Sequence, residues 1–175
     1  MKYLKYYLYA LIVFLLDQAA KWVIVKRIPI GEERPVLGDF LVITSHRNRG
    51  AAFGILQNQR WFFIIITIIV VIGILWYLRK TIREGKVLLS FALSLLLGGA
   101  LGNFLDRALF GEVVDFIQVT FDFDIFGKSI YYIYPIFNVA DSAIVIGVIL
   151  IFLESLLVWR REKKGATHEH KPDLS

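Results

Sequence analysis

The chain has 175 residues, of which 57% are hydrophobic and 15% aromatic, and its mean hydropathy is +0.63. A soluble domain has about 45 to 50% apolar residues, so this composition indicates an integral membrane protein. The chain has no cysteine, which excludes a disulfide framework, a thiol nucleophile and a cysteine-ligated metal. The net charge of +5 does not indicate nucleic-acid binding, because the basic residues cluster beside apolar segments, as contacts with anionic lipid and membrane topology require.

Four apolar segments are long enough to cross a bilayer. Each has about the 20 residues that a helix needs to span roughly 30 Å of hydrocarbon. Because lipid offers no partner to backbone polar groups, and no segment alternates like a membrane β-barrel strand, we expect four transmembrane helices. The predicted spans cover approximately residues 6–25, 61–78, 87–105 and 138–159. The sequence thus predicts an all-α membrane protein, with one membrane domain over residues 1–161 and a polar, disordered cytoplasmic tail over 162–175.

The first span follows Lys2 and Lys5, so the N-terminus also resembles a secretory signal peptide. Asp17 and Lys21 interrupt the apolar run, and no clear cleavage site of small residues follows it. We therefore predict an uncleaved first helix. Since Asp17 and Lys21 are four residues apart, we expect them to form an ion pair within the membrane.

The two long connections contain patterns typical of strands. Residues 40–44 and 113–119 are rich in β-branched and aromatic side chains, and residues 120–126 and 129–134 flank Gly127-Lys128 like the strands of a hairpin. We expect a small β platform at the outer membrane surface. The neighbours Ser45 and His46 do not indicate a serine nucleophile with its base, because successive side chains of a strand point to opposite faces.

Polar residues mark the faces of the third and fourth helices that turn inward. We expect Asp106 and Arg107 to pair with each other at the membrane interface. Gly98 and Gly102 form a GxxxG pattern, which allows a neighbouring helix to approach the third helix closely. The two polar sets are Asn103, Asp106 and Arg107 at the end of the third helix, and Asn138, Asp141 and Ser142 at the start of the fourth.

Two aspartates carry the strongest functional signal. Asp115 lies just beyond the third helix, and Asp141 lies in the first turn of the fourth. A charged side chain at membrane depth costs about 2.5 to 3.5 kcal/mol, so carboxylates here indicate a functional site. If the two helices pack together, the carboxyls can share a proton, and one can activate water while the other polarises a carbonyl. The positive end of the fourth helix favours charge on Asp141, although the pair titrates as a unit.

The short flanks of the spans predict the topology. Basic residues dominate both chain ends and the connection between the second and third spans, which places these parts in the cytoplasm and the two long connections outside. The first long connection also carries several basic residues, against this rule. The cytoplasmic basic residues are Lys2, Lys5, Arg79, Lys80, Arg83, Lys86, Arg160, Arg161, Lys163 and Lys164.

Aspartic-protease chemistry is one of several functions that these residues allow. A proton-coupled transporter would also use membrane carboxylates, but it needs an access path from the inner side, where the helices look apolar. A noncatalytic membrane scaffold would tolerate replacement of both aspartates. The motifs H-E-x-x-H and G-x-S-x-G of other proteases are absent. In the tail, His168 and His170 lack a third ligand and do not indicate a metal site.

Five sequence blocks in a fixed order carry a resemblance to a known family. Together they resemble the motif set of the bacterial lipoprotein signal peptidases, the type II signal peptidases, from the first span to the fourth. The blocks are Asp17-Gln-Ala-Ala-Lys21, Asn48-Arg-Gly-Ala-Ala-Phe-Gly54, Gly98-Gly-Ala-Leu-Gly-Asn-Phe-Leu-Asp-Arg107, Val113-Val-Asp-Phe116 and Phe137-Asn-Val-Ala-Asp141.

This resemblance implies an intramembrane aspartic endopeptidase of the bacterial inner membrane. Its substrate would be a prolipoprotein in membrane lipid, cut just before a cysteine that bears diacylglycerol. Asp115 and Asp141 would form the catalytic dyad near the outer face, with Asp17 and Lys21 as support. No metal, organic cofactor or nucleic acid is expected. The other implied residues, which line the site or position substrate, are Asn48, Gly99, Asn103, Arg107, Asn138 and Ala140.

Overall fold

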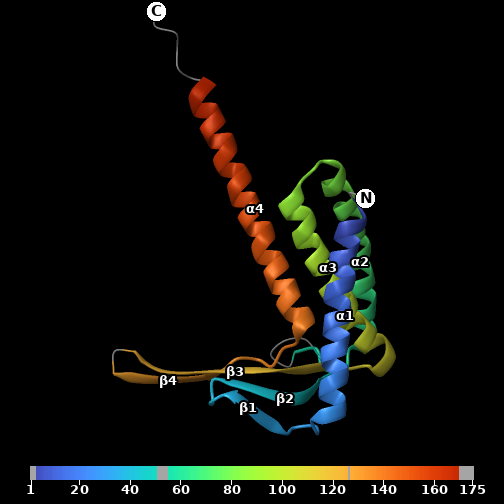
Figure 1. Ribbon diagram of the computed structural model, residues 1–175, viewed down its shortest axis with the longest axis vertical. Coiled ribbons are helices and arrows are strands. Elements are labelled where there is room, and N and C mark those ends of the chain that lie inside the picture. Colours follow the sequence, from blue (N-terminus) through green and yellow to red (C-terminus); the bar gives the residue numbers. More distant parts are fainter. Residues whose placement is uncertain (1–2, 51–54, 126, 170–175) are drawn as a thin grey trace, which may run out of the picture.

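The computed structural model describes residues 3–50, 55–125 and 127–169, and within them the chain forms four long helices and a small antiparallel sheet (Figure 1). All four helices are long and apolar enough to cross a membrane. The predicted fold class is therefore confirmed. The elements are α1 (Leu4–Arg27), β1 (Glu33–Leu37), β2 (Leu41–Asn48), α2 (Arg60–Arg83), α3 (Val87–Phe110), β3 (Val113–Ile125), β4 (Lys128–Ile133) and α4 (Val139–Glu169).

Most helices extend beyond the predicted apolar spans. α2 continues through a basic last turn to Arg83, and α4 continues to Glu169. A helix can continue past the end of its apolar stretch, because lysine and arginine are also good helix formers. The polar tail thus begins as helix. Residues 170–175 lie outside the described residues, so disorder there stays a prediction.

α3 is the central helix, since it packs against α1, α2 and α4. Far from the sheet, α1, α2 and α3 share a buried group of apolar side chains, here called the apolar cluster. α2 turns most of its surface outward, as expected for a helix that contacts lipid. The apolar cluster consists of Tyr6, Ala10, Leu78, Ile82, Leu89, Leu93 and Leu97.

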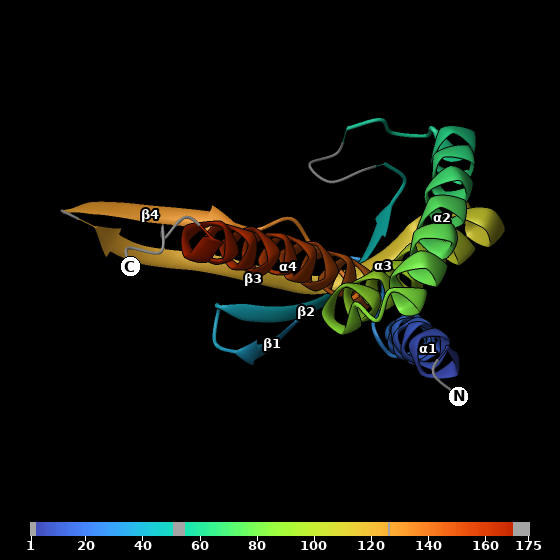
Figure 2. The same cartoon turned by 90° about the horizontal axis from the view of Figure 1, so that it is seen from above.

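The sheet has the order β1-β2-β3-β4, and every neighbouring pair is antiparallel. β3 is the longest strand, and it joins the predicted hairpin to the end of α3. Seen along the helices, the β3–β4 hairpin projects from the bundle in the direction in which α4 leans (Figure 2). β1 was not expected, because all five of its residues are exposed and include Pro35, so it lacks the alternation of a half-buried strand.

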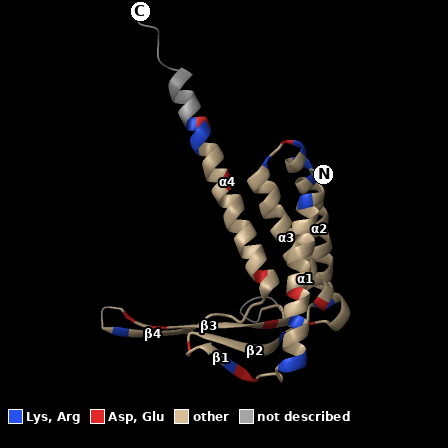
Figure 3. Ribbon diagram, in the orientation of Figure 1, with Lys and Arg blue, Asp and Glu red and all other residues tan. Residues whose placement is uncertain are grey.

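The sheet lies across one end of the bundle (Figure 1). There, Ile24 and Ile28 near the end of α1 pack against Val114 and Phe116 of β3. The start of α1, the α2–α3 connection and the far end of α4 all lie at the opposite end, where basic residues gather (Figure 3). This arrangement fixes β3 beside the ends of α3 and α4, and thereby brings two distant parts of the sequence together.

Candidate active site

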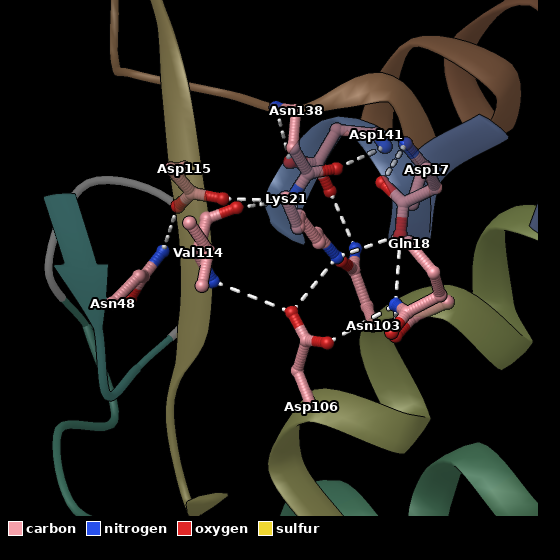
Figure 4. A network of polar contacts seen from close by, with 12 residues as sticks. Asp17, Gln18, Lys21, Asn48, Asn103, Asp106, Val114, Asp115, Asn138 and Asp141 are labelled. Carbon is pink, nitrogen blue, oxygen red and sulfur yellow. Dashed lines mark hydrogen bonds and ion pairs between the residues drawn. The ribbon is translucent and has the colours of Figure 1, made fainter. Parts of the chain in front are cut away.

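Asp115 and Asp141 reach one cavity from different elements. Asp115 lies on β3 and is 2% exposed, whereas Asp141 is half-buried in the first turn of α4. Both line a cavity of about 580 Å³, here called the site cavity. Asn138 bridges them: its side-chain Nδ2 donates to Asp115 Oδ1 at 2.7 Å, and its backbone N–H donates to Asp141 Oδ2 at 3.2 Å (Figure 4). The structure thus brings the two aspartates together as the sequence predicted.

The local sequence explains how Asp141 is oriented. Asn138 immediately precedes α4, and its Oδ1 accepts a hydrogen bond from the Asp141 N–H at 2.9 Å. Together with the bond from the Asn138 N–H to the Asp141 carboxylate, this forms a reciprocal capping box, which occupies two backbone donors that a helix start leaves free. The spacing Asn-x-x-Asp therefore fixes the helix start and the Asp141 rotamer together.

Two further asparagines complete the contacts of the pair. Asn48 of β2 donates from Nδ2 to Asp115 Oδ2 at 2.9 Å, and Asn103 of α3 donates from Nδ2 to Asp141 Oδ1 at 2.7 Å. Asn138 Nδ2 also lies 3.1 Å from Asn103 Oδ1. All four carboxylate oxygens thus accept a hydrogen bond from an asparagine, which holds both groups at fixed positions.

A buried lysine lies directly behind this pair. Lys21 of α1 is 3% exposed, and its Nζ lies 2.8 Å from Asp17 Oδ2, 2.9 Å from Asp106 Oδ2 and 3.0 Å from Asn103 Oδ1. The predicted pair of Asp17 and Lys21 is therefore present, with a second carboxylate added. We call Asp17, Gln18, Lys21, Asn103 and Asp106 the Lys21 network (Figure 4).

The two carboxylates of this network hold the backbone next to the aspartate pair. Asp17 Oδ1 accepts a hydrogen bond from the Ala140 N–H at 2.9 Å, and Asp106 Oδ2 accepts one from the Val114 N–H at 3.3 Å. Ala140 and Val114 each directly precede one aspartate of the pair. A single ammonium group thus ties together the two carboxylates that fix the chain beside Asp115 and Asp141.

Sequence reasoning missed Gln18 and assigned Asp106 the wrong partner. Gln18 Nε2 donates to Asp106 Oδ1 at 3.1 Å and to the Gly102 carbonyl at 3.2 Å. The signal for Gln18 was its place on the same helical face as Lys21, three residues away. The predicted pair of Asp106 with Arg107 is wrong: among the described residues, Asp106 pairs with Lys21 instead.

Arg107 turns toward the site cavity. Its Nη2 donates to the Gly50 carbonyl at 2.9 Å, and its guanidinium lies 4.6 Å from the centre of the Phe63 ring. Arg107 also lines the site cavity, so it brings a cation close to the aspartate pair. Arg60 closes the end of α3 by donating to the Arg107 and Ala108 carbonyls.

Small residues of α3 and α4 allow this close packing. A Cβ atom at Gly99 would lie 2.5 Å from the Ala140 carbonyl oxygen, and one at Gly102 would lie 2.5 Å from Asp17 Oδ2. Gly98 meets the Ala10 carbonyl of α1 in the same way. The predicted residues Gly99 and Ala140 therefore lie at the α3–α4 contact rather than on the cavity wall, and they act by letting the helices approach.

The surroundings of Asp115 shift its protonation. Burial, and then the negative charge of Asp141, raise the pKa of Asp115 from its ordinary 3.8 to about 7, while the hydrogen bonds from Asn48 and Asn138 oppose this shift. Asp115 therefore exchanges its proton near neutral pH. Within the described residues, no group of three or more histidine, aspartate or glutamate side chains has the arrangement of a metal site. Residues 51–54 of the second motif block lie outside the described residues.

Fold and site together define a multi-pass membrane protein with a bridged pair of carboxyl groups in a cavity at one end of its helices. A family model described as signal peptidase (SPase) II matches residues 9–157, and the chain belongs to this family. It is therefore a bacterial membrane protease that cleaves signal peptides from prolipoproteins, which decides against the transporter and the scaffold.

Similar proteins support this assignment over nearly the whole chain. The lipoprotein signal peptidase of Bacillus pumilus is 49% identical over 93% of this chain and 99% of its own. The lipoprotein signal peptidase of Halalkalibacterium halodurans is 51% identical over 91% of this chain and 96% of its own. A bacterial membrane enzyme solved at 2.3 Å resolution matches with a TM-score of 0.73 at 43% identity, over 98% of this chain and 94% of the other. A second bacterial membrane enzyme, solved at 1.9 Å resolution, matches with a TM-score of 0.71 at 47% identity, over 87% of this chain and 92% of the other.

Proposed function

We propose that Asp115 and Asp141 are the catalytic dyad and that they cut the substrate just before a diacylglyceryl-modified cysteine. The observation that carries this proposal is the bridged geometry: two carboxyls from β3 and α4 are held by one asparagine at the wall of one cavity. The raised pKa of Asp115 supports it further, since a pair that holds one proton at neutral pH can act as acid and base at once.

In the proposed reaction, Asp141 is the base and Asp115 the acid. The Asp141 carboxylate takes a proton from a water molecule, whose oxygen attacks the scissile carbonyl carbon, while protonated Asp115 gives its proton to the carbonyl oxygen. A neutral tetrahedral intermediate with two hydroxyl groups results. Asp115 then takes back a hydroxyl proton as the carbon–nitrogen bond breaks, and Asp141 gives its proton to the leaving amine. The dyad returns to its starting state.

The asparagines and Arg107 have separate proposed tasks. Asn48, Asn103 and Asn138 orient the carboxyls, because each donates to one of them in the resting site. Arg107 uses only one of its guanidinium nitrogens in hydrogen bonds within the described residues, so other donors stay available to a substrate carbonyl in the site cavity. Asp17 and Lys21 support the dyad through the contacts of the Lys21 network.

The membrane setting supports a lipid-modified substrate and an outward-facing site. The dyad lies at the sheet end of the bundle, and the basic α2–α3 connection lies at the other. Because basic connections favour the cytoplasmic side, we assign both termini to the cytoplasm and the dyad to the outer side. A signal peptide and the acyl chains of its cysteine can then reach the dyad within the bilayer, whose apolar interior matches both.

The deciding experiment is cleavage of a diacylglyceryl-modified prolipoprotein by the purified protein and by Asp115→Asn and Asp141→Asn. We expect each substitution to reduce cleavage by at least about a thousandfold, because each removes a group that must transfer a proton. Thermal unfolding establishes that the variants are folded. Asp122→Asn is the matched control, since it makes the same change on the exposed part of β3. An unlipidated substrate tests the need for the lipid.

The outcomes separate the parts of the proposal. Full activity in a folded Asp115→Asn or Asp141→Asn variant would refute the dyad. Equal cleavage of the unlipidated substrate would refute recognition of the lipidated cysteine and leave the dyad intact. Mass determination of the mature product locates the cut, and a new N-terminus other than the cysteine would refute the proposed position.

A further inference from the structure

Gln118 is a buried residue of β3 that the proposed reaction does not use. Its side chain is 9% exposed and makes no hydrogen bond with the part of the chain that the structure describes. Every completely buried side-chain nitrogen or oxygen in that part does have a hydrogen-bond partner. The Gln118 carboxamide therefore keeps access to open space, and Gln118 lines the site cavity.

Gln118 differs in this respect from the asparagines of the site. The side chains of Asn48, Asn103 and Asn138 all donate to Asp115 or Asp141. Their amides are thus committed to the dyad before substrate arrives. Gln118 retains an oxygen that accepts and a nitrogen that donates, which is the combination that a peptide unit requires from a partner.

The main chain of β3 cannot take this task near Gln118, because both of its edges are already paired. On one side, Gln118 pairs with Val42 of β2. On the other side, the Phe137 N–H donates to the Ile117 carbonyl at 3.0 Å, and the Tyr134 N–H donates to the Val119 carbonyl at 2.9 Å. A substrate that passes this part of the sheet must therefore bind to side chains.

The distance between Gln118 and the dyad along β3 determines which part of an extended substrate Gln118 can reach. It lies three residues after Asp115, and a strand rises about 3.3 Å per residue, so the two positions are about 10 Å apart along β3. An extended substrate covers this distance with about three residues. The register between β2 and β3 shifts between Ile43 and His46, where β2 has one residue more than β3. Asp115 and Gln118 both line the site cavity.

We propose that the Gln118 carboxamide binds one main-chain peptide unit of the substrate, about three residues after the lipidated cysteine. This inference rests on the proposed function. The mature side of the cut is the side concerned, because the apolar signal helix needs the bilayer beside the spans, whereas β3 leads away from the bundle across its end (Figure 1). Gln118 is therefore a substrate-positioning residue that reads the backbone and not a particular side chain.

The test pairs Gln118→Leu with substrates that carry one N-methyl group. N-methylation removes a single backbone N–H, and a set of diacylglyceryl-cysteine peptides places it at successive residues on both sides of the cut. In the unmodified substrate, we expect Gln118→Leu to raise KM about tenfold with little change in kcat. For the wild-type protein, N-methylation about three residues after the cysteine should cost a similar factor, and for Gln118→Leu it should cost no more than about twofold.

Thr120→Val is the matched control, because Thr120 is 5% exposed on the same strand and is not part of the cavity wall. It should leave KM and the N-methyl effects unchanged, and thermal unfolding checks that both variants are folded. An unchanged KM in Gln118→Leu would overturn the inference. So would an N-methyl effect that Gln118→Leu abolishes at a residue on the signal-peptide side of the cut. Absence of cleavage of the unmodified peptide by the wild-type protein would instead refute the proposed function.

Discussion

Two buried regions at opposite ends of the bundle are built on different principles. The apolar cluster is formed by side chains of α1, α2 and α3 that contact one another without directional bonds. The Lys21 network joins α1 and α3 to β3 and α4 by hydrogen bonds and ion pairs of 2.7 to 3.3 Å. Most side chains of both regions are buried, but only the network contacts the backbone directly before each aspartate of the pair.

The difference follows from the bilayer as a solvent. Lipid tails are as apolar as leucine, so contacts between apolar helix faces gain little from leaving lipid and tolerate small displacements. A charge in the same environment has few acceptable positions, because an unpaired one is costly. A region that must fix two carboxyl groups therefore needs polar contacts, whereas a region that only joins helices does not.

Removal of the Lys21 ammonium should have the largest effect. Lys21→Met leaves the buried carboxylates of Asp17 and Asp106 without a cation, and breaking a buried pair in this way costs about 3 to 5 kcal/mol. We expect a marked drop in unfolding temperature and at least about a hundredfold loss of cleavage. Lys26→Met, an exposed lysine near the end of the same helix, is the control. Wild-type stability in Lys21→Met would show that the network does not hold the bundle end together.

Substitution of Asp106 should have a smaller effect, because Lys21 keeps its ion pair with Asp17. Asp106→Asn weakens the bond that Asp106 accepts from the Val114 N–H, so β3 should hold Asp115 less firmly and kcat should fall about tenfold. The control is Glu112→Gln, which removes the carboxylate that Arg47 and Arg49 share. This carboxylate is 23% exposed, whereas that of Asp106 is 4% exposed. Because pairs open to solvent contribute about 1 kcal/mol or less, this variant should keep most of its cleavage activity. If the two variants were equally impaired, burial would not be what matters.

The pH dependence tests the charge state of the pair. Because Asp115 must be protonated as the acid and its pKa is about 7, kcat/KM should fall about tenfold per unit at higher pH. Asn48→Ala removes a bond that lowers this pKa, so the fall should move to higher pH.

For stability, a carboxyl whose folded-state pKa is raised loses its favourable contribution as pH increases from about 3.8 to about 7. Asp115→Asn should flatten this part of the stability curve, and activity that rises steadily above pH 7 would contradict the assignment.

The sequence predicted those parts of the molecule that depend on local patterns. Span length and hydropathy determine the helices, and the spacing of Asp17 and Lys21 determines their pair. Gly127 marks the predicted hairpin, but Lys128, which was predicted to be part of the turn, already belongs to β4 and pairs with Ile125. Asn138 and Asp141 are also linked by local spacing, which permits a capping box. These features need no knowledge of how the helices pack.

The remaining features depend on contacts between elements, and sequence reasoning failed there. Asp106 directly precedes Arg107 in the sequence, but the packing of α1 on α3 places its carboxylate against Lys21 instead. Gln18 shares a helical face with Lys21 in the sequence, but its partner Asp106 became known only from that same contact. Family resemblance implied Gly99 as a residue that lines the site or positions substrate, but the structure places it at the α3–α4 contact, where the Ala140 carbonyl approaches closely.

The smallest effect on catalysis should come from the apolar cluster. Leu93→Ala opens a cavity at a residue that is 4% exposed, and such changes cost about 2 to 5 kcal/mol through lost packing contacts. We therefore expect a lower unfolding temperature but unchanged KM, kcat and pH profile, measured below that temperature. Leu109→Ala, at an exposed position of the same helix, is the control. A tenfold change of kcat in folded Leu93→Ala would mean that the apolar cluster also sets the dyad geometry, because a loss of packing alone would then have reached the aspartates through α3.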